Sequence, residues 1–326
     1  MHSLLECITF DRTLEGEMDL PPRFRAPYPT SSPIPVNSSS KGLLLGSLGV
    51  LIFSLTMPAT KIALSGDGMS AWFIWSGRAV LAAFSGIVYL MLTHRRLPPR
   101  KAWWPLLGTT AGVVFGWPLL NSIALQSVSS SHSAVINGIL PLATAVIGAT
   151  LNREKLTPAF WACAVVGTSL VCGYAWFRAS GTLHTPDALL LLGVLLGGLG
   201  YSCGAIAAKY MSGPEVISWA LLLALPATLP LMLYLIPTSL AAVSIRAWIG
   251  FAYLGLMSQW IGFFFWYRGL LIGGIARVSQ VQLVQLFLTL GFSALLLGES
   301  IEPLMLAVAI ATVALIFVGR HTKAVR

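Results

Sequence analysis

Apolar residues follow one another in long runs from Lys41 onward, and short polar connections separate the runs. Ten runs come near the roughly 20 residues with which an α-helix crosses the hydrocarbon core of a bilayer. Turn residues such as Gly66-Asp67-Gly68 end them. The pattern predicts an all-α, polytopic membrane protein with ten transmembrane helices. The predicted spans are Gly42–Leu64, Ala71–Thr93, Trp103–Ala124, Ser131–Leu151, Ala159–Phe177, Ala188–Tyr210, Val216–Leu235, Trp248–Arg268, Ile275–Leu297 and Ile301–Val318.

A block of the second half of the chain matches a block of the first half at one constant shift. Glu299 falls on Glu154, a shift of 299 − 154 = 145, and the same shift lays Trp248 on Trp103. The shift spans an odd number of predicted helices, so the two copies must cross the bilayer in opposite senses, as in many secondary transporters. The sequence therefore predicts two inverted five-helix repeats, at residues 41–178 and 187–319.

Composition agrees with a membrane protein, and this class of protein determines how the positive net charge is interpreted. Hydrophobic residues make up 56% of the chain and charged residues 10%, whereas roughly a quarter of the residues in soluble domains are charged. The net charge of +9 comes largely from basic residues between apolar runs, so we interpret it as a topology signal and predict no nucleic-acid partner. These residues gather in alternate connections, which predicts cytosolic termini and a bacterial inner (plasma) membrane protein.

The two ends of the chain differ from the apolar part. Residues 1–40 combine acidic residues, prolines and a serine run, which predicts a disordered cytosolic tail, or an overextended gene start with Met18 as the true first residue. Residues 320–326 predict a short basic cytosolic tail. The four cysteines have neither disulfide nor metal-ligand spacing, and we predict no metal and no cofactor.

Polar residues on the ninth span form the strongest candidate for a site. Ser279, Gln282, Gln285, Thr289 and Ser293 are spaced three or four apart, so they share one face of a helix. The 145-residue shift lays Gln282 on Asn137 of the fourth span. Amides and hydroxyls are costly against lipid, so both faces should look inward. They either line a cavity or form hydrogen bonds between helices.

The third and eighth spans add aromatic and amide side chains. Trp117 and Asn121 lie four residues apart on the third span, and Gln259 and Trp266 share a face of the eighth. Large rings with one polar group suit an amphipathic solute. An interfacial aromatic belt is an equally good interpretation of Trp266. Arg78 lies about two turns inside the second span and needs carbonyl, hydroxyl or anionic partners, in a functional or a structural role.

Other features indicate packing rather than chemistry. Gly108, Gly112 and Gly116 form a stripe without side chains, which predicts a closely packed neighbouring helix. The cluster of Ser129, Ser130, Ser131, His132 and Ser133 lies at a turn, where helix capping is expected rather than a nucleophilic role. Lys61 lies near a helix end, where its amine can reach the interface. No Asp or Glu falls mid-span, so the sequence provides no evident carboxylate relay for protons, and enzyme motifs are absent.

Several short segments together resemble the drug/metabolite transporter superfamily, EamA branch. They are Pro58-Ala59-Thr60-Lys61, Gly77-Arg78-Ala79, the run from Gly138 to Ala145, Phe263 to Gly269, and Gly298-Glu299. The resemblance implies a metabolite exporter that works by alternating access, with a central cavity formed by the first, third, fourth, sixth, eighth and ninth spans. Relatives typically have a proline where this chain has Leu286, so the helix break there should be milder.

These observations predict a transporter of small metabolites, not an enzyme. A site rich in amides and aromatic rings but without acids favours neutral, zwitterionic or weakly anionic solutes such as amino acids. A membrane-embedded enzyme, a structural membrane partner and a passive pore are the alternatives. The expected partners are a small-molecule metabolite and the lipid bilayer, and a homodimer is compatible with the sequence. The predicted binding residues are Trp117, Asn121, Asn137, Gln259, Trp266, Gln282 and Gln285, with Arg78 as a carboxylate anchor.

Overall fold

The computed structural model describes residues 36–65, 68–152, 158–178, 184–273, 278 and 281–321. The chain divides into a short unit, Met1–Val36, and a large one, Asn37–Arg326, whose fold is described below. Its first helix, α2 (Val36–Ser54), begins inside the segment predicted as a tail. Residues 1–35 lie outside the described part. The last helix, α16 (Pro303–His321), likewise reaches into the predicted basic tail.

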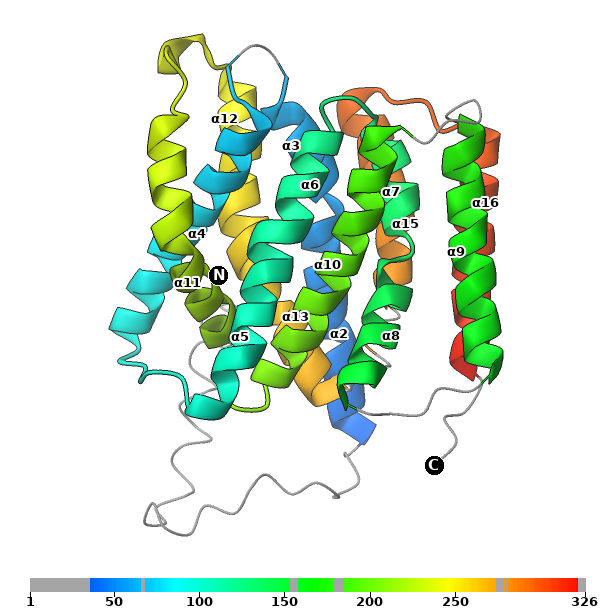
Figure 1. Cartoon of the computed structure of the whole chain (residues 1–326), viewed down its shortest axis with the longest axis horizontal. Helices are drawn as coiled ribbons and strands as arrows, with labels where there is room; N and C mark the ends of the chain where they lie inside the picture. The colour runs from blue at the N-terminus through cyan, green and yellow to red at the C-terminus, as the bar shows by residue number, and fades with distance from the viewer. Residues whose placement is uncertain are drawn as a thin grey trace. The chain divides into compact units, whose positions relative to one another are not determined.

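The helices of the first repeat occupy the five predicted spans, and three of those spans are built from more than one helical segment (Figure 1). The first span joins α2 to α3 (Thr56–Ala63), and the second is α4 (Ala71–Leu92). The third runs through η1 (Arg100–Ala102), α5 (Trp103–Thr109), the π-helix η2 (Thr110–Gly116) and α6 (Trp117–Ala124). The fourth joins α7 (Ser130–Asn137) to α8 (Leu140–Asn152), and the fifth is α9 (Pro158–Arg178).

The second repeat follows the same plan. Its first two spans are α10 (Thr185–Ala207) and α11 (Gly213–Tyr234), followed by the short η3 (Leu240–Ala242). The next span runs through α12 (Ile245–Ala252), the π-helix η4 (Tyr253–Ile261) and α13 (Gly262–Gly273). The last two are α15 (Gln282–Leu297) and α16. Within the described residues, seven helical spans are long and apolar enough to cross a membrane, and two shorter apolar helices accompany them. With α9, which is not among those nine, described helices occupy all ten predicted spans, and the all-α, ten-span prediction is confirmed.

Two interruptions occur at prolines, whose missing N–H leaves a carbonyl of the preceding turn without its helical donor. Pro58 leaves the carbonyl of Ser54 free at the break between α2 and α3, and the Thr289 hydroxyl donates to that oxygen at 2.9 Å. Pro141 follows the break between α7 and α8. In both places an apolar span exposes backbone polar groups inside the bundle, where a neighbouring side chain can satisfy them.

Pro118 has a similar effect at the end of the π-helix η2. The Trp117 N–H bonds the carbonyl of Gly112, five residues back, and Pro118 offers no N–H to the two carbonyls that follow. Trp75 Nε1 donates to the Val114 oxygen at 2.8 Å, and Gln259 Nε2 donates to the Val113 oxygen at 3.1 Å. Side chains from two other spans therefore complete the backbone bonding of the third.

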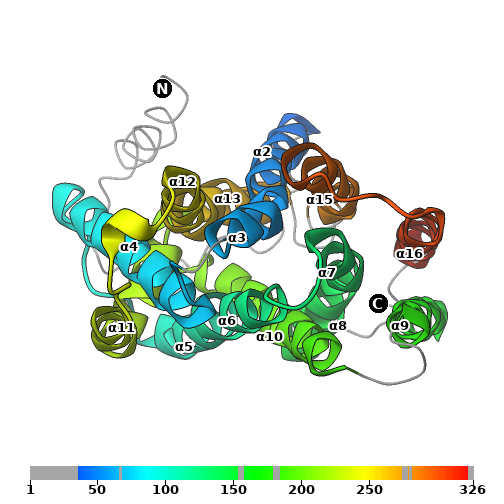
Figure 2. The same cartoon turned by 90° about the horizontal axis from the view of Figure 1, so that it is seen from above.

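Glycine stripes bring α10 close to the third span. A Cβ on Gly112 would overlap the Leu196 carbonyl and the backbone of Gly200, and one on Gly116 would meet the Leu196 side chain. The tight packing predicted from these glycines is confirmed. Figures 1 and 2 show α10 beside α5 and α6, with α9 and α16 side by side on the flank of the bundle.

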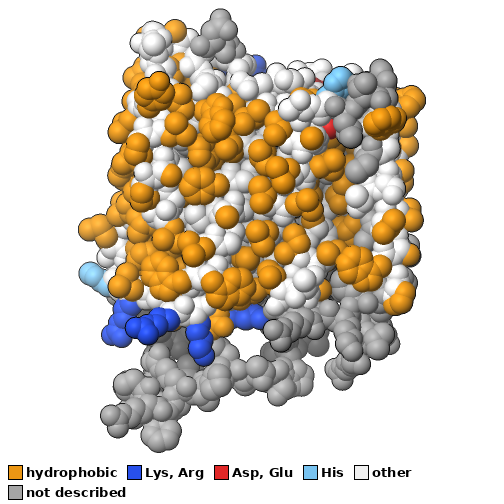
Figure 3. Space-filling model, viewed as in Figure 1, with side chains coloured by type: hydrophobic (Ala, Val, Ile, Leu, Met, Phe, Trp, Pro, Cys, Tyr) orange, Lys and Arg blue, Asp and Glu red, His pale blue; other side chains and the backbone are white. Residues whose placement is uncertain are grey.

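The surface is divided as a membrane protein requires. Apolar side chains cover the flank in Figure 3, and basic side chains gather beyond one end of it. Figure 1 places the connection between α4 and α5 at this end, and that connection carries Arg95, Arg96, Arg100 and Lys101. Since basic residues favour the cytosolic side, this end is the predicted inner end.

Candidate functional site

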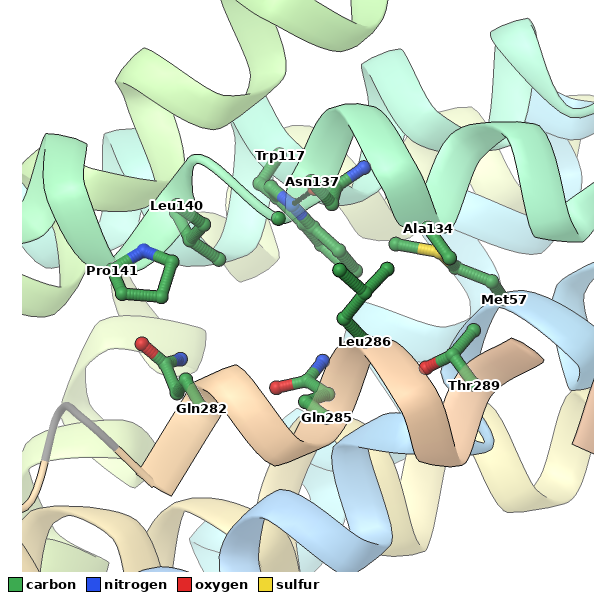
Figure 4. A pocket seen from close by; sticks show the side chains of 11 residues that line it. Met57, Trp117, Ala134, Asn137, Leu140, Pro141, Gln282, Gln285, Leu286 and Thr289 are labelled. Atoms are coloured by element: carbon green, nitrogen blue, oxygen red, sulfur yellow. Dashed lines mark hydrogen bonds between the residues drawn. The ribbon is translucent and has the colours of Figure 1, made fainter. Parts of the chain in front are cut away.

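Two small cavities lie inside the bundle, and together they include six of the eight residues predicted to bind substrate. Each encloses about 20 Å³, which is room for about one water molecule. Trp117 and Gln285 line both cavities and separate them. The first cavity also has Asn137, Pro141, Gln282, Leu286 and Thr289 on its walls (Figure 4), and the second has Phe53, Thr56, Arg78, Tyr201, Ser258, Gln259 and Phe263.

Asn137 holds the third and fourth spans together beside the first cavity. Its Oδ1 accepts from Trp117 Nε1 at 2.7 Å, and its Nδ2 donates to Asn121 Oδ1 and to the Ser133 carbonyl, both at 3.0 Å. Asn121 Nδ2 in turn donates to the Trp117 carbonyl at 2.9 Å. Asn121 is buried behind this network and lines neither cavity. The helix break after Asn137 leaves its side chain at the cavity wall.

The polar stripe of α15 divides into two parts. Thr289 and Ser293 bond other helices, to the Ser54 carbonyl and to the Ser130 hydroxyl, as the interhelical interpretation predicts. Gln282 instead faces the turn between α7 and α8 across the first cavity (Figure 4), and both polar atoms of its amide are buried without a hydrogen-bond partner. Its amide is therefore free to bind a ligand. Ser279 lies outside the described residues.

Arg78 is a buried cation in the wall of the second cavity. Its side chain is 2% exposed, one terminal nitrogen donates to Ser258 Oγ at 3.1 Å, and Nε has no partner. Ser258 Oγ also bonds Thr56 Oγ1 at 2.8 Å. Among the described residues, no ion pair joins Arg78 to a carboxylate. The guanidinium thus keeps hydrogen-bonding capacity beside an internal space.

Gln259 and Trp266 of the eighth span have different positions. Gln259 lines the second cavity while its Nε2 bonds the Val113 carbonyl. Trp266 is fully buried and packs on Phe53 and Tyr201, two of the rings on the wall of that cavity, with ring centroids 6.2 and 5.7 Å away. It supports the wall from behind, and the interfacial-belt interpretation is wrong for this residue because its side chain lies in the interior.

Glu299 forms a contact that the sequence analysis did not anticipate. Its carboxylate accepts from the backbone N–H groups of Ser130 and Ser131, each at 2.8 Å, and from the Ser131 hydroxyl at 2.6 Å. We call these three bonds the Glu299 clasp, which joins the end of α15 to the amino terminus of α7. Ser129 caps the same helix through the His132 N–H, so the predicted capping role is confirmed. A carboxylate is well placed there because a helix amino terminus attracts negative charge.

Two further polar contacts lie at this end of the bundle. Lys61 Nζ donates to the carbonyls of Leu125 and Val128 at 2.7 and 2.8 Å, so the amine binds the carboxyl end of the third span instead of extending to the interface as expected. His132 Nε2 lies 2.7 Å from Asp187 Oδ1, which links α7 to α10. The serine run at the start of α7 was the only sequence signal for these contacts, because their partners are distant in the chain.

Comparison with known proteins agrees with the fold and identifies the family. The sequence profile of the EamA-like transporter family matches residues 40–174 and again residues 184–319. The "Uncharacterized transporter YdeK" of Bacillus subtilis (strain 168) is 39% identical over 286 residues, which are 88% of this chain and 99% of that protein. A protein of known crystal structure, 18% identical, matches 86% of this chain and 95% of its own with a TM-score of 0.61, which supports the fold alone. The chain therefore belongs to the EamA-like transporter family of the drug/metabolite transporter superfamily.

Proposed function

We propose that this membrane transporter exports small metabolites, namely neutral, zwitterionic or weakly anionic solutes such as amino acids, by alternating access through the two central cavities. The observation that carries the proposal is the convergence of polar side chains from both repeats on the interior of an apolar bundle. Asn137 and Arg78 come from the first repeat, and Gln259 and Gln282 from the second. Polar groups inside a membrane bundle are costly and usually mark a substrate path.

The interrupted helices support a change of access. Spans one, three and four are broken near the cavities, and in spans one and three side chains of other spans bond the freed carbonyls. Such bonds can exchange partners at lower cost than the continuous ladder of a straight helix. The cavities, at about 20 Å³ each, are smaller than an amino acid, so binding requires their walls to separate. We infer a bacterial inner (plasma) membrane location with both termini cytosolic, which the basic residues of the connection between α4 and α5 support.

Uptake by proteoliposomes across a panel of amino acids and related metabolites tests the proposal. We expect saturable flux, which Gln282→Leu reduces at least tenfold because leucine cannot offer the unpartnered amide to a solute. Gln126→Leu is the matched control, since Gln126 is exposed in the connection after α6. This variant should transport the solute at the wild-type rate. Wild-type flux in Gln282→Leu would remove this residue from the site. Flux that does not saturate would favour a passive pore, and no flux for any compound would favour an enzyme or a structural partner.

A further inference from the structure

Arg78 places a fixed positive charge beside the second cavity. Arginine stays protonated in proteins, and its desolvation inside a membrane costs several kcal/mol unless an anion or suitable dipoles compensate for it. The guanidinium donates a hydrogen bond to the hydroxyl of Ser258, and its Nε is buried without a partner. The structure thus leaves the charge only partly compensated.

Carboxylates are absent from the cavity walls in the part of the chain that the structure describes. Asp187 and Glu215 lie in the first turns of α10 and α11, and Glu299 and Glu302 lie between α15 and α16. None of these four lines either cavity. The acidic residues outside the described part belong by sequence to connections or to the segment before Lys41. The described walls therefore supply dipoles but no counter-charge for Arg78, and an anion that enters from solution can supply it.

The remaining walls of the second cavity are mostly apolar. The Phe53 ring centroid lies 4.9 Å from that of Phe263 and 6.5 Å from that of Tyr201, and all three rings line the cavity with Val113 and Pro118. A planar guanidinium fork beside aromatic walls matches a carboxylate that carries an apolar or aromatic body. The ammonium group of a zwitterion would find no carboxylate among the described wall residues, and a cation would be repelled.

We propose that Arg78 is an anion subsite and that the chain exports organic monocarboxylates with an apolar or aromatic body, driven by the membrane potential alone. This inference rests on the proposed transport function and narrows its substrate class. Arg78 does not leave the protein, so one negative charge crosses the membrane per transported monoanion. A cytosol that is electrically negative expels that charge, and the cycle then needs no proton relay, which agrees with the lack of mid-span carboxylates.

Three probes with one body and different charges test the subsite: 3-phenylpropanoate, phenylalanine and 2-phenylethylamine. The purified full-length protein should bind 3-phenylpropanoate at least tenfold more tightly than the other two, measured by thermal stabilisation at a pH where the acid is ionised. Arg78→Gln should remove that preference, and Arg78→Lys should restore part of it. Lys209→Gln, which removes a positive charge from the exposed turn after α10, should keep the wild-type preference.

Proteoliposomes with an imposed potassium diffusion potential test the driving force, with protein-free vesicles as the background. One charge across 100 mV, about 2.3 kcal/mol, should concentrate 3-phenylpropanoate about 50-fold on the positive side. Equal binding of the three probes, binding of none of them, or flux that ignores the potential would overturn the inference. Potential-independent phenylalanine flux that survives in Arg78→Gln would overturn it while leaving the proposed transport function intact. If Arg78→Gln does not fold, the wild-type probe series and its potential dependence decide the question alone.

Discussion

The Glu299 clasp should help to hold one end of the substrate path closed, and Glu299→Gln tests this directly. The three bonds of the clasp connect the second repeat to the first at the start of α7. Separation of α15 from α7 at this end breaks all three. We therefore expect the substitution to favour conformations in which this end is open, without removing any side-chain volume.

The size of the effect follows from the chemistry of the bonds. A hydrogen bond to a charged group contributes about 1.5–3 kcal/mol and a neutral one about 0.5–1.5 kcal/mol. Glutamine keeps one acceptor oxygen and turns an NH₂ group toward the other N–H donor, so at least one bond is lost and the rest are weakened. Because Glu299 is partly exposed, solvent reduces the difference, and we take about 2 kcal/mol in total. That is about a 30-fold shift of the equilibrium toward the open form.

Cysteine labelling measures this shift. Ala134 is 3% exposed, lies one turn after Ser130 and lines the first cavity, so Ala134→Cys should react slowly with an impermeant thiol reagent. The reagent is applied on the side from which Ser239→Cys reacts. Ser239 is exposed in the connection between α11 and α12, which Figure 1 places at the same end as the start of α7. Glu299→Gln should raise the labelling rate about 30-fold.

Glu215→Gln is the matched control, because its carboxylate also caps a helix, through hydrogen bonds from Ser212 of the same turn, and its ion pair with Arg95 at 3.9 Å does not involve α7 or α15. It should lower stability without changing the labelling of Ala134→Cys. The chain without an added cysteine gives the background. An unchanged labelling rate in Glu299→Gln, with both proteins folded, would show that the clasp does not control access.

Two further substitutions test the packing of the third span. Trp75→Phe should lower the free energy of unfolding by about 1–3 kcal/mol, because the buried Val114 carbonyl loses the hydrogen bond from Trp75 Nε1. Trp72→Phe, on the exposed face of α4, should have little effect, and equal losses in the two variants would argue against the role of this bond. Gly112→Ala should lower the yield of folded protein, because the added methyl group would overlap the backbone of α10. Gly291→Ala, which has open space around it, should be tolerated. A stable Gly112→Ala protein would contradict the close approach of α10 to the third span.

The architecture could be predicted from the sequence because it depends on properties that are local or repeated. Lipid requires about 20 apolar residues per helix, so the spans are visible in the composition of each run. The helical period places Gln282 and Thr289 on one face, and the structure turns that face inward. The Gly112 stripe predicts a close neighbour, although not that the neighbour would be α10.

The roles of individual polar residues could be predicted less well, because each depends on which atoms its neighbours leave unsatisfied. Thr289 and Gln282 look alike on a helical wheel, yet Thr289 bonds a carbonyl that Pro58 frees, and Gln282 meets an empty space. Trp266 shares a helix face with Gln259, so the sequence predicted that its ring would contact the solute. Its side chain is instead buried behind the wall of the second cavity. Such outcomes follow from contacts between spans that are distant in the sequence.

The positions of the two π-helical segments could have been related to each other through the sequence repeat. The 145-residue shift carries η2, residues 110–116, onto residues 255–261, which lie within η4. A widened turn therefore occurs at equivalent positions of both repeats, and the Gln259 to Val113 bond joins one to the other beside Arg78. Only η2 is followed by a proline, so Pro118 cannot be the common cause. What the two turns share is a position in the wall of the same cavity, through Val113 of η2 and through Ser258 and Gln259 of η4. In η2 the side chains of Trp75 and Gln259 satisfy displaced carbonyls, which makes the widened turn tolerable inside the bundle.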